Sequence, residues 1–338
     1  MAKFYLYSNH SEEDSSDLGI DFGTSNFLVY RKDKGIVLNE PSVVAVEKGT
    51  KKIIAVGTEA RKMLQRVPEI IIAIRPMRDG VIADIESAEK MFRYFISKAL
   101  PRYRYIKPRM AIGIPSDITE VELRGVEESA YKSGAREVHV IDKSILAAIG
   151  ANIPIGEPAG HMICDIGGGT TEIAVIALGK LYLANAIRLG GDEFDRAILK
   201  HMRNVHNLII NAQMAEQIKM KIGNVAPAKT IEKMKIKGTH AITGLSQQLE
   251  IDSVEVSQAL EEPVTQIVHE IETTLGKTCP EFGADIVDRG IVMTGEGSLL
   301  KGLDKLIEKK TGVPVIVAEQ PGNCAVIGAG KHFDYLKS

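Results

Sequence analysis

The chain of 338 residues has only three cysteines, no tryptophan and a formal net charge of −2. Cys164, Cys279 and Cys324 are odd in number and far apart, so we expect neither a disulfide framework nor a structural zinc site, and a reducing cytoplasm fits best. The small net charge and the lack of a basic stripe with interleaved aromatics argue against a nucleic-acid partner. No stretch holds about 18 consecutive apolar residues, so no membrane-spanning helix is expected.

The chain is longer than one hydrophobic core usually covers, which is about 250–300 residues, so two domains are expected. Its first segment, MAKFYLYSNHSEEDSSD, is not a secretory signal, because the apolar run Phe4–Tyr7 is short and acidic residues follow it. We interpret residues 1–17 as a disordered acidic arm. The alternative is that Phe4–Tyr7 make a weak contact with a membrane or a partner.

The most informative stretch is MICDIGGGTTEIAV, in which an apolar strand brings Asp165 to three glycines and two threonines. Three consecutive glycines weaken a strand, because glycine loses the most backbone entropy on folding. They also allow the backbone to lie directly against a ligand with its N–H groups pointing one way, which suits phosphate. Taken alone, the stretch fits an ordinary hairpin equally well, since short glycine motifs often match by chance.

A second copy of this layout lies near the N-terminus. In DLGIDFGTSNFLVY a strand brings Asp21 to a Gly-Thr-Ser-Asn turn, and another strand follows. Each copy is later followed by a strand, a glycine-containing loop and a helix, in MAIGIPSDITEVELRGVEESAYKSGAREVHVI and in RGIVMTGEGSLLKGLDKLIEKKTGVPVIVA. Thr119 and Glu122 predict a capping box at the start of the first of these helices. If the two halves face each other, both carboxylates and both glycine turns converge on one cleft, so the matched pair favours a binding site.

The residue types in the two turns suit a nucleoside triphosphate with a divalent cation. Backbone amides can donate hydrogen bonds to phosphate oxygens, as can the hydroxyls of Thr24, Ser25, Thr170 and Thr171. Two carboxylates beside phosphate groups imply a cation between them, and Mg²⁺ takes one or two carboxylates together with phosphate oxygens. Asp21 and Asp165 are therefore the predicted Mg²⁺ ligands, directly or through water.

Several stretches also resemble a known family. IDFGTSN, DIGGGTTE, LGGDEFD and GIVMTGEGSLLKGL resemble the nucleotide site of the superfamily of actin, sugar kinases and heat-shock chaperones. GIVLNEPSVVAV, IRPMRDGVIADIE, SGAREVHVI, AEQIKMKIG and ADIVDRGIVMTG are similar to MreB, the bacterial actin family, and the resemblance runs from about Leu18 to Lys331. It implies an α/β, actin-like two-lobed fold, with duplicated ribonuclease-H-like domains and a nucleotide cleft between them. The implied lobe I is 18–145 and 325–338 with subdomain IB inserted at about 33–75, and lobe II is 146–324 with subdomain IIB inserted at about 182–250.

The resemblance also implies how ATP or ADP is held. The first turn would grip the β- and γ-phosphates, Asp21 would organise Mg²⁺, and Asp165 would sit on the water shell of the metal. Glu216 and Lys219 would face the ribose and adenine, and the loop at 295–298 would close around the adenosine. The implied nucleotide-binding residues are Asp21, Gly23, Thr24, Ser25, Asn26, Gly167, Gly168, Gly169, Thr170, Gly190, Gly191, Asp192, Glu216, Lys219, Gly295, Glu296, Gly297 and Ser298.

Two departures from the family pattern concern the chemistry. MreB proteins usually read IEEP before AAIGA, and the second glutamate positions the attacking water, whereas VIDKSILAAIGA places Asp142, Lys143 and Ser144 there. An ammonium cannot deprotonate water, and losing a general base typically removes ~10²–10⁴ in rate. We therefore predict weak ATP hydrolysis or a long-lived ATP state, with Asp165, Lys143, Asp142 and Thr170 as the candidate catalytic residues and Asp142 as a partial substitute for the glutamate. Glu296 replaces a family glycine and either crowds the adenosine pocket or points to solvent.

We infer the partners of this chain from one surface loop and from the family resemblance. PRYRYIKP is an aromatic and basic loop that suits an anionic bilayer, although an ordinary surface loop could have the same composition. The helix before it carries four apolar residues at helical spacing that we expect in the core, namely Met91, Phe92, Phe95 and Ile96. The expected membrane contacts are Leu100, Tyr103, Tyr105 and Ile106. The resemblance implies filaments of this chain on the inner face of the cell membrane, with other cytoskeletal proteins or paralogues as further partners. It places a lateral filament contact at Val121, Leu123 and Arg124.

The implied role is in cell shape. A weakened hydrolytic site is what we would expect of a Spiroplasma-type paralogue, which would add motility in a wall-less cell. Two other functions of the same superfamily stay open. A chaperone ATPase would need a substrate-binding domain after the nucleotide core, whereas this sequence ends at Ser338. A small-molecule kinase would use an aspartate as base toward a sugar hydroxyl and would commonly need a longer chain; filaments would argue against it and sugar-dependent phosphoryl transfer for it.

Overall fold

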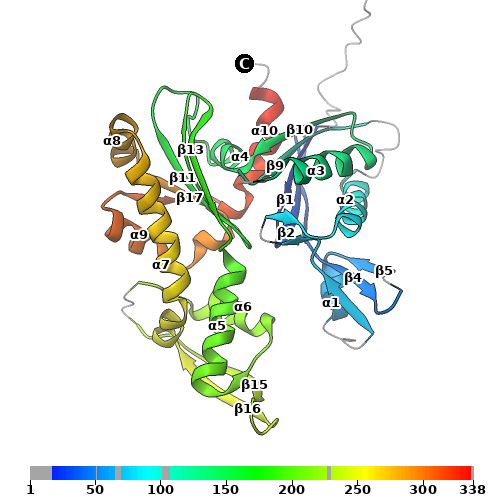
Figure 1. Ribbon diagram of the computed structural model, residues 1–338, viewed down its shortest axis with the longest axis vertical. Coiled ribbons are helices and arrows are strands. Elements are labelled where there is room, and N and C mark those ends of the chain that lie inside the picture. The colour runs from blue at the N-terminus through cyan, green and yellow to red at the C-terminus, as the bar shows by residue number, and fades with distance from the viewer. Residues whose placement is uncertain are drawn as a thin grey trace, which may run out of the picture.

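Two lobes, each with a five-stranded mixed sheet, make up the protein (Figure 1). The computed structural model describes residues 17–50, 52–64, 70–78, 80–100, 107–116, 118–226 and 230–335. In lobe I the strand order is β10 (Glu137–Asp142), β9 (Arg109–Ile114), β1 (Leu18–Phe22), β2 (Asn26–Arg31) and β3 (Gly35–Pro41). In lobe II it is β13 (Lys180–Ile187), β12 (Thr171–Ala177), β11 (His161–Ile166), β17 (Ile291–Thr294) and β18 (Val315–Val317).

The two sheets share one topology, as the duplication in the sequence predicts. A central strand pairs antiparallel with its hairpin partner and parallel with the strand of the next strand–loop–helix unit, β1 with β2 and β9, and β11 with β12 and β17. Every position of β1 and β11 is buried, as expected for strands covered on both faces. The registers place Asp21 beside Gly113 and Asp165 beside Thr294, so the two aspartates occupy equivalent places in the two lobes.

Helices cover the sheets, and the predicted capping box is present. Lobe I has α2 (Ile85–Ala99) and α3 (Glu120–Lys132), and lobe II has α5 (Gly191–His206), α7 (Ser253–Lys277), α8 (Pro280–Arg289) and α9 (Leu303–Thr311). At the start of α3 the Glu122 N–H donates to the Thr119 hydroxyl at 3.3 Å, and the Thr119 N–H donates to a Glu122 carboxylate oxygen at 2.9 Å. These two bonds satisfy amides that a helix start otherwise leaves unpaired.

Two helices, α4 (Lys143–Gly150) and α10 (Cys324–Tyr335), cross in the middle of the molecule between the two sheets (Figure 1). Glycines let their backbones touch. A Cβ atom on Gly150 would lie 1.8 Å from the Cys324 carbonyl oxygen, and one on Gly328 would lie 1.8 Å from the Leu146 carbonyl oxygen. The close crossing fixes α4, and with it Lys143 at its first position.

A smaller unit extends each lobe. Lobe I carries the sheet β5-β4-β6 with α1, and lobe II carries the sheet β14-β15-β16 with α6. The bounds are β4 (Val44–Glu47), β5 (Ile53–Val56), α1 (Thr58–Leu64), β6 (Ile71–Ile74), β14 (Leu208–Ile209), α6 (Ala212–Ile222), β15 (Lys233–His240) and β16 (Ser246–Asp252); a short hairpin of β7 (Met77–Arg78) and β8 (Val81–Ile82) follows β6. Residues 35–41 and 182–187, expected inside the insertions, instead extend the large sheets by pairing with β2 and β12. Both small units therefore begin after these strands.

The lobe I core corrects one prediction about the surface. Met91, Phe92, Phe95 and Ile96 are fully buried, as predicted. Leu100 packs into the same core and is only 7% exposed, so the prediction that its side chain contacts a membrane is wrong. The apolar face of α2 continues through its C-cap, and this turns Leu100 inward.

Several predicted surface features lie outside the described residues, namely Tyr103, Tyr105, Ile106 and residues 1–16. Asp17, the last residue of the predicted arm, is buried and accepts a hydrogen bond of 2.8 Å from Arg109 Nε. Among the helices of the described ranges, none combines the length and apolar character that crossing a bilayer requires. The three cysteines are free thiols, in agreement with the expectation of no disulfide.

Candidate functional site

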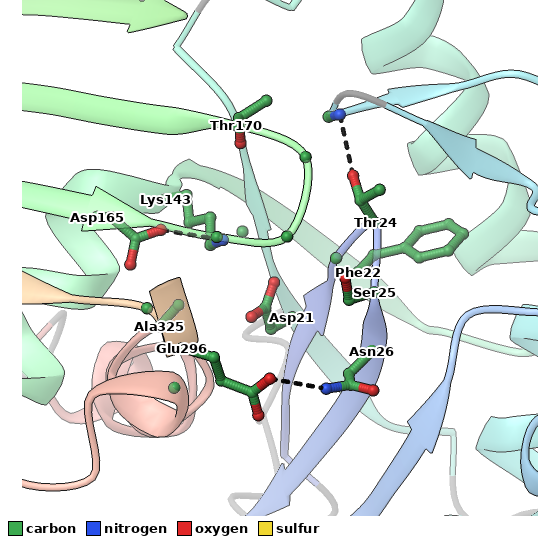
Figure 2. A pocket seen from close by; sticks show the side chains of 18 of the residues that line it. Asp21, Phe22, Thr24, Ser25, Asn26, Lys143, Asp165, Thr170, Glu296 and Ala325 are labelled. Carbon is green, nitrogen blue, oxygen red and sulfur yellow. Dashed lines mark hydrogen bonds and ion pairs between the residues drawn. The ribbon is translucent and has the colours of Figure 1, made fainter. Parts of the chain in front are cut away.

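A cleft between the lobes collects most of the predicted site (Figure 2). It holds about 690 Å³ of space, counting its open mouth. The β1–β2 turn lines one side and the β11–β12 turn the other. The predicted residues that line it are Asp21, Gly23, Thr24, Ser25, Asn26, Lys143, Asp165, Gly167, Gly168, Gly169, Thr170, Gly295 and Glu296.

The two glycine-rich turns meet at van der Waals distance. A Cβ atom on Gly168 would lie 1.9 Å from the Ser25 hydroxyl oxygen and 2.8 Å from Ser25 Cβ, so only glycine fits there. A third segment joins them, because the Gly80 N–H donates to the Thr24 hydroxyl at 3.1 Å. The backbone groups of both turns therefore face the same space, as the matched pair in the sequence predicted.

The segment at 190–192 supports the second turn and does not line the cleft. The Gly191 N–H donates to the Gly167 carbonyl at 2.9 Å, and the Asp192 N–H donates to the Gly168 carbonyl at 2.8 Å. A Cβ atom on Gly190 would lie 2.5 Å from the Gly167 carbonyl oxygen, so this glycine is needed for close approach. These residues therefore fix the shape of the second glycine turn.

Lys143 and Asp165 form the buried ion pair at the base of the cleft (Figure 2). The Lys143 ammonium lies 3.0 Å from one carboxylate oxygen of Asp165, and the Thr294 hydroxyl donates to the other at 2.7 Å. Burial by itself lowers the pKa of Lys143, but the carboxylates of Asp165 and Asp21 outweigh burial and raise it above its ordinary value. Lys143 is therefore a cation at neutral pH and cannot accept a proton from water.

Asp21 faces the same space from lobe I. Burial raises the pKa of its carboxyl, Lys143 opposes this, and the neighbouring carboxylates of Asp165 and Glu296 raise it further. Among the described residues, none donates a hydrogen bond to the Asp21 carboxylate. Its oxygens are thus free to meet a cation or a ligand.

Asp142 and Ser144 flank Lys143 but point elsewhere. The Asp142 carboxylate caps α4 by accepting a hydrogen bond from the Ser144 N–H at 2.8 Å, and it does not line the cleft. The Ser144 hydroxyl donates to Glu172 at 3.1 Å. Burial raises the pKa of Glu172 to about 8, against the opposing effect of Lys143. Of the Asp-Lys-Ser stretch, only Lys143 therefore reaches the predicted phosphate site.

The third loop, at 295–298, closes the cleft from lobe II. Gly295 has φ +79° and a Cβ there would lie 2.2 Å from the Ile166 carbonyl oxygen, so the turn requires glycine. Glu296 lines the cleft, and the Asn26 amide donates to its carboxylate at 3.5 Å across the lobes (Figure 2). Gly297 and Ser298 do not line the cleft, and the buried Ser298 hydroxyl donates to the Gly295 carbonyl at 2.7 Å. Glu296 is therefore turned toward the cleft, although the residue is exposed.

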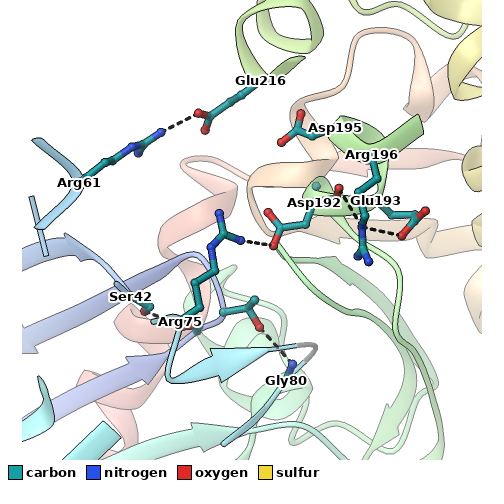
Figure 3. A network of polar contacts seen from close by, with 12 residues as sticks. Ser42, Arg61, Arg75, Gly80, Asp192, Glu193, Asp195, Arg196 and Glu216 are labelled. Carbon is teal, nitrogen blue, oxygen red and sulfur yellow. Dashed lines mark hydrogen bonds and ion pairs between the residues drawn. The ribbon is translucent and has the colours of Figure 1, made fainter. Parts of the chain in front are cut away.

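Glu216 and Lys219, expected at the ribose and adenine, make contacts within the protein, and Figure 3 shows that of Glu216 with Arg61. Glu216 pairs with Arg61 of α1 at 2.6 Å, which joins the two small units. Lys219 lies 2.9 Å from Asp195 and donates to the Gly191 carbonyl at 2.9 Å. A second bridge between the lobes pairs Arg75 with Asp192 at 2.7 Å. Neither Glu216 nor Lys219 lines the cleft.

Eight further residues line the cleft without having been predicted. They are Phe22, Leu28, Gly80, Gly113, Pro115, Pro321, Gly322 and Ala325. Gly113 and Pro115 had a signal in the sequence, because GIPS in the first copy corresponds to GEGS in the second. Phe22 and Gly80 lie within the family-like stretches IDFGTSN and IRPMRDGVIADIE. Ala325, in the first turn of α10, had no such signal, since only the fold brings that helix to the cleft.

Comparison with known proteins identifies the family. The family described as MreB/Mbl protein matches residues 15–338. The chain belongs to the MreB/Mbl family. It is 46% identical over 320 residues to the cell shape-determining protein Mbl of Bacillus subtilis (95% of this chain, 96% of that protein) and 43% identical over 327 residues to the cell shape-determining protein MreB of Escherichia coli K12 (95% and 94%).

Solved structures confirm the actin-like fold that the sequence predicted. The chain is similar to Spiroplasma citri MreB5, bound to AMPPNP (TM-score 0.89, 31% identical, covering 95% of this chain and 96% of that one) and bound to ADP (TM-score 0.90, 32% identical, with the same coverage). It shares its fold with the MamK double helical filament (TM-score 0.79, 23% identical, 94% and 98%). This chain is less similar in sequence to the Spiroplasma protein than to Bacillus Mbl. The origin of this chain in a wall-less cell therefore stays a prediction.

Proposed function

We propose that this chain is an ATP-binding bacterial actin homologue that assembles into cell-shape filaments and hydrolyses ATP slowly. The observation that carries the proposal is the meeting of the two glycine turns in one cleft, with Gly168 against Ser25 and the carboxylates of Asp21 and Asp165 beside them. Membership of the MreB/Mbl family supports it, as do the AMPPNP and ADP bound to the similar Spiroplasma protein.

The residues of the cleft fit Mg²⁺ in combination with phosphate. The described ranges contain no group of three or more histidine, cysteine, aspartate or glutamate side chains that could hold a metal ion alone. Mg²⁺ needs only one or two carboxylates when phosphate oxygens complete its shell. Asp21 would bind it most directly, whereas Asp165 already uses both oxygens on Lys143 and Thr294 and would act through water. When bound, the ion would neutralise phosphate charge.

Filament formation is supported by exposed apolar side chains on segments of lobe II that Figure 1 places at its opposite ends. Ile242 and Leu245, in the β15–β16 hairpin, are 78% and 69% exposed. Leu178, in the β12–β13 turn, and Val287, in α8, are 62% and 54% exposed at the other end. Different surfaces that meet head to tail generate open filaments. Val121, 77% exposed on α3, is the proposed lateral contact, and attachment to the inner face of the membrane belongs to the same proposal.

Electron microscopy and sedimentation test the assembly. With ATP and Mg²⁺ the purified chain is expected to form filaments, and Ile242→Asp with Leu245→Asp is expected to abolish pelleting while nucleotide affinity stays within about twofold. Pelleting should be lost because burying charges in an apolar contact is costly. Nucleotide affinity should be kept because this hairpin is remote from the cleft. A chain that stays monomeric but transfers phosphate to a sugar would instead support the kinase alternative.

Lys143 is the proposed cause of slow hydrolysis. Lys143→Glu is expected to raise phosphate release by about 10²-fold, because a carboxylate at the first position of α4 can orient and deprotonate water. Release is measured from Mg·ATP over protein concentrations that span assembly. Lys143→Gln, which removes the charge without supplying a base, should stay slow, and Lys305→Glu on the surface controls for the change in net charge. Equal rates for wild type and Lys143→Glu would contradict this role and leave Asp142 or another group to position the water.

A further inference from the structure

Lys143 is the one cationic residue among the described residues that line the cleft. Its side chain is 13% exposed, and its ammonium lies 3.0 Å from Asp165. The ammonium also lies close beneath the second glycine turn, since a Cβ atom on Gly167 would be 3.6 Å from Nζ. The charge is therefore fixed between the two carboxylates and the turn that would hold phosphate.

The charges around the Lys143 ammonium indicate its role. Asp21, Asp165 and Glu296 line the same cleft, and all three would repel the phosphates of a nucleotide. A divalent ion is the usual means of relieving such repulsion. Here the Lys143 ammonium already pairs with Asp165, so one carboxylate is neutralised before any ion or nucleotide arrives.

The contacts of Asp165 also indicate that Mg²⁺ contributes less to nucleotide binding here. Both of its carboxylate oxygens have partners, Lys143 Nζ and the Thr294 hydroxyl, so a metal that binds Asp165 directly would share an oxygen with one of them and meet the Lys143 charge close by. A metal in this cleft thus meets the carboxylates of Asp21 and Glu296 and, beside Asp165, a positive charge that opposes its binding. The energy that Mg²⁺ adds to nucleotide binding is correspondingly reduced.

We propose that Lys143 is a built-in counterion for the nucleotide phosphates, so that the chain binds ATP and ADP with little dependence on Mg²⁺. This rests on the proposed nucleotide-binding function and refines it. The ammonium can donate three hydrogen bonds on a flexible stem, so Lys143 can keep its pair with Asp165 and donate to phosphate oxygens at the same time.

The test compares the dissociation constant of AMPPNP in excess Mg²⁺ and in excess EDTA, at equal ionic strength, for wild type and Lys143→Gln. Removing Mg²⁺ is expected to weaken binding by less than about fivefold in wild type and by about 100-fold or more in Lys143→Gln, because a charge pair at short range in a partly buried site is worth a few powers of ten. Lys143→Arg keeps the charge and should behave as wild type. Lys305→Gln, an exposed lysine of α9, is the matched control.

The outcomes separate the two proposals. If wild type loses as much affinity in EDTA as Lys143→Gln does, or if both lose little, the counterion role is overturned while nucleotide binding stands. If no variant binds AMPPNP even with Mg²⁺, the proposed function itself fails. Melting temperatures with and without AMPPNP give a second readout that also shows whether Lys143→Gln is folded, since a ligand that binds only the native state raises the melting temperature.

Discussion

Gly168→Ala is expected to weaken nucleotide binding by at least about 100-fold while the protein stays folded. The added Cβ would lie 1.9 Å from the Ser25 hydroxyl oxygen and 2.8 Å from Ser25 Cβ, and rotation of the hydroxyl relieves only the first of these contacts. The two turns must then separate, and losing one or two amide hydrogen bonds to charged phosphate, at about 1.5–3 kcal/mol each, corresponds to roughly 10²-fold in the dissociation constant. Titration with a fluorescent ATP analogue measures the loss.

Two further variants sharpen this prediction. Gly156→Ala adds the same methyl group where nothing lies within 4 Å, and its affinity should match wild type. Ser25→Gly in the Gly168→Ala background removes the atoms that clash, so part of the affinity should return. Wild-type affinity in Gly168→Ala would mean that the two turns do not grip the nucleotide together.

Gly328→Ala is expected to lower the melting temperature by about 6 °C or more. Its Cβ would lie 1.8 Å from the Leu146 carbonyl oxygen and 2.6 Å from the carbonyl carbon, both backbone atoms of α4 that cannot rotate away. Overpacking of this kind costs about 3 kcal/mol, and each kcal/mol corresponds to roughly 2 °C in a protein of this size. Differential scanning fluorimetry without nucleotide measures the change.

The matched control for this variant is Gly283→Ala in α8. Nothing lies within 4 Å of the position of its Cβ, and alanine is the better helix former, so the melting temperature should stay the same or rise. An unchanged melting temperature in Gly328→Ala would show that α4 and α10 are not packed backbone to backbone. The crossing that places Lys143 would then need another explanation.

The parts of the site that could be predicted are those written locally in the sequence. The β1–β2 and β11–β12 hairpins, with Asp21 and Asp165 before their glycines, are short-range patterns, and their duplication indicated that they would face each other. The capping box at Thr119 is equally local. Each of these predictions needed only neighbouring residues and the expectation of two similar lobes.

The parts that could not be predicted depend on contacts between distant segments. Glu216 sits on the expected helix, but only the folded chain brings Arg61 to it. Leu100 directly precedes an aromatic and basic stretch typical of a membrane surface, yet the packing of α2 on lobe I buries it. Gly80 reaches the first turn through a hydrogen bond from its backbone N–H to the Thr24 hydroxyl, a contact between segments far apart in the chain.

The measurement that tests the central claim most directly is the nucleotide content of sedimented filaments over time after assembly with Mg·ATP. We expect pellets to contain nucleotide in proportion to protein and ATP to remain the main species for hours, because Lys143 cannot act as a base and instead holds the phosphates. Pellets whose nucleotide is ADP within minutes of assembly, or that form equally well without nucleotide, would contradict it.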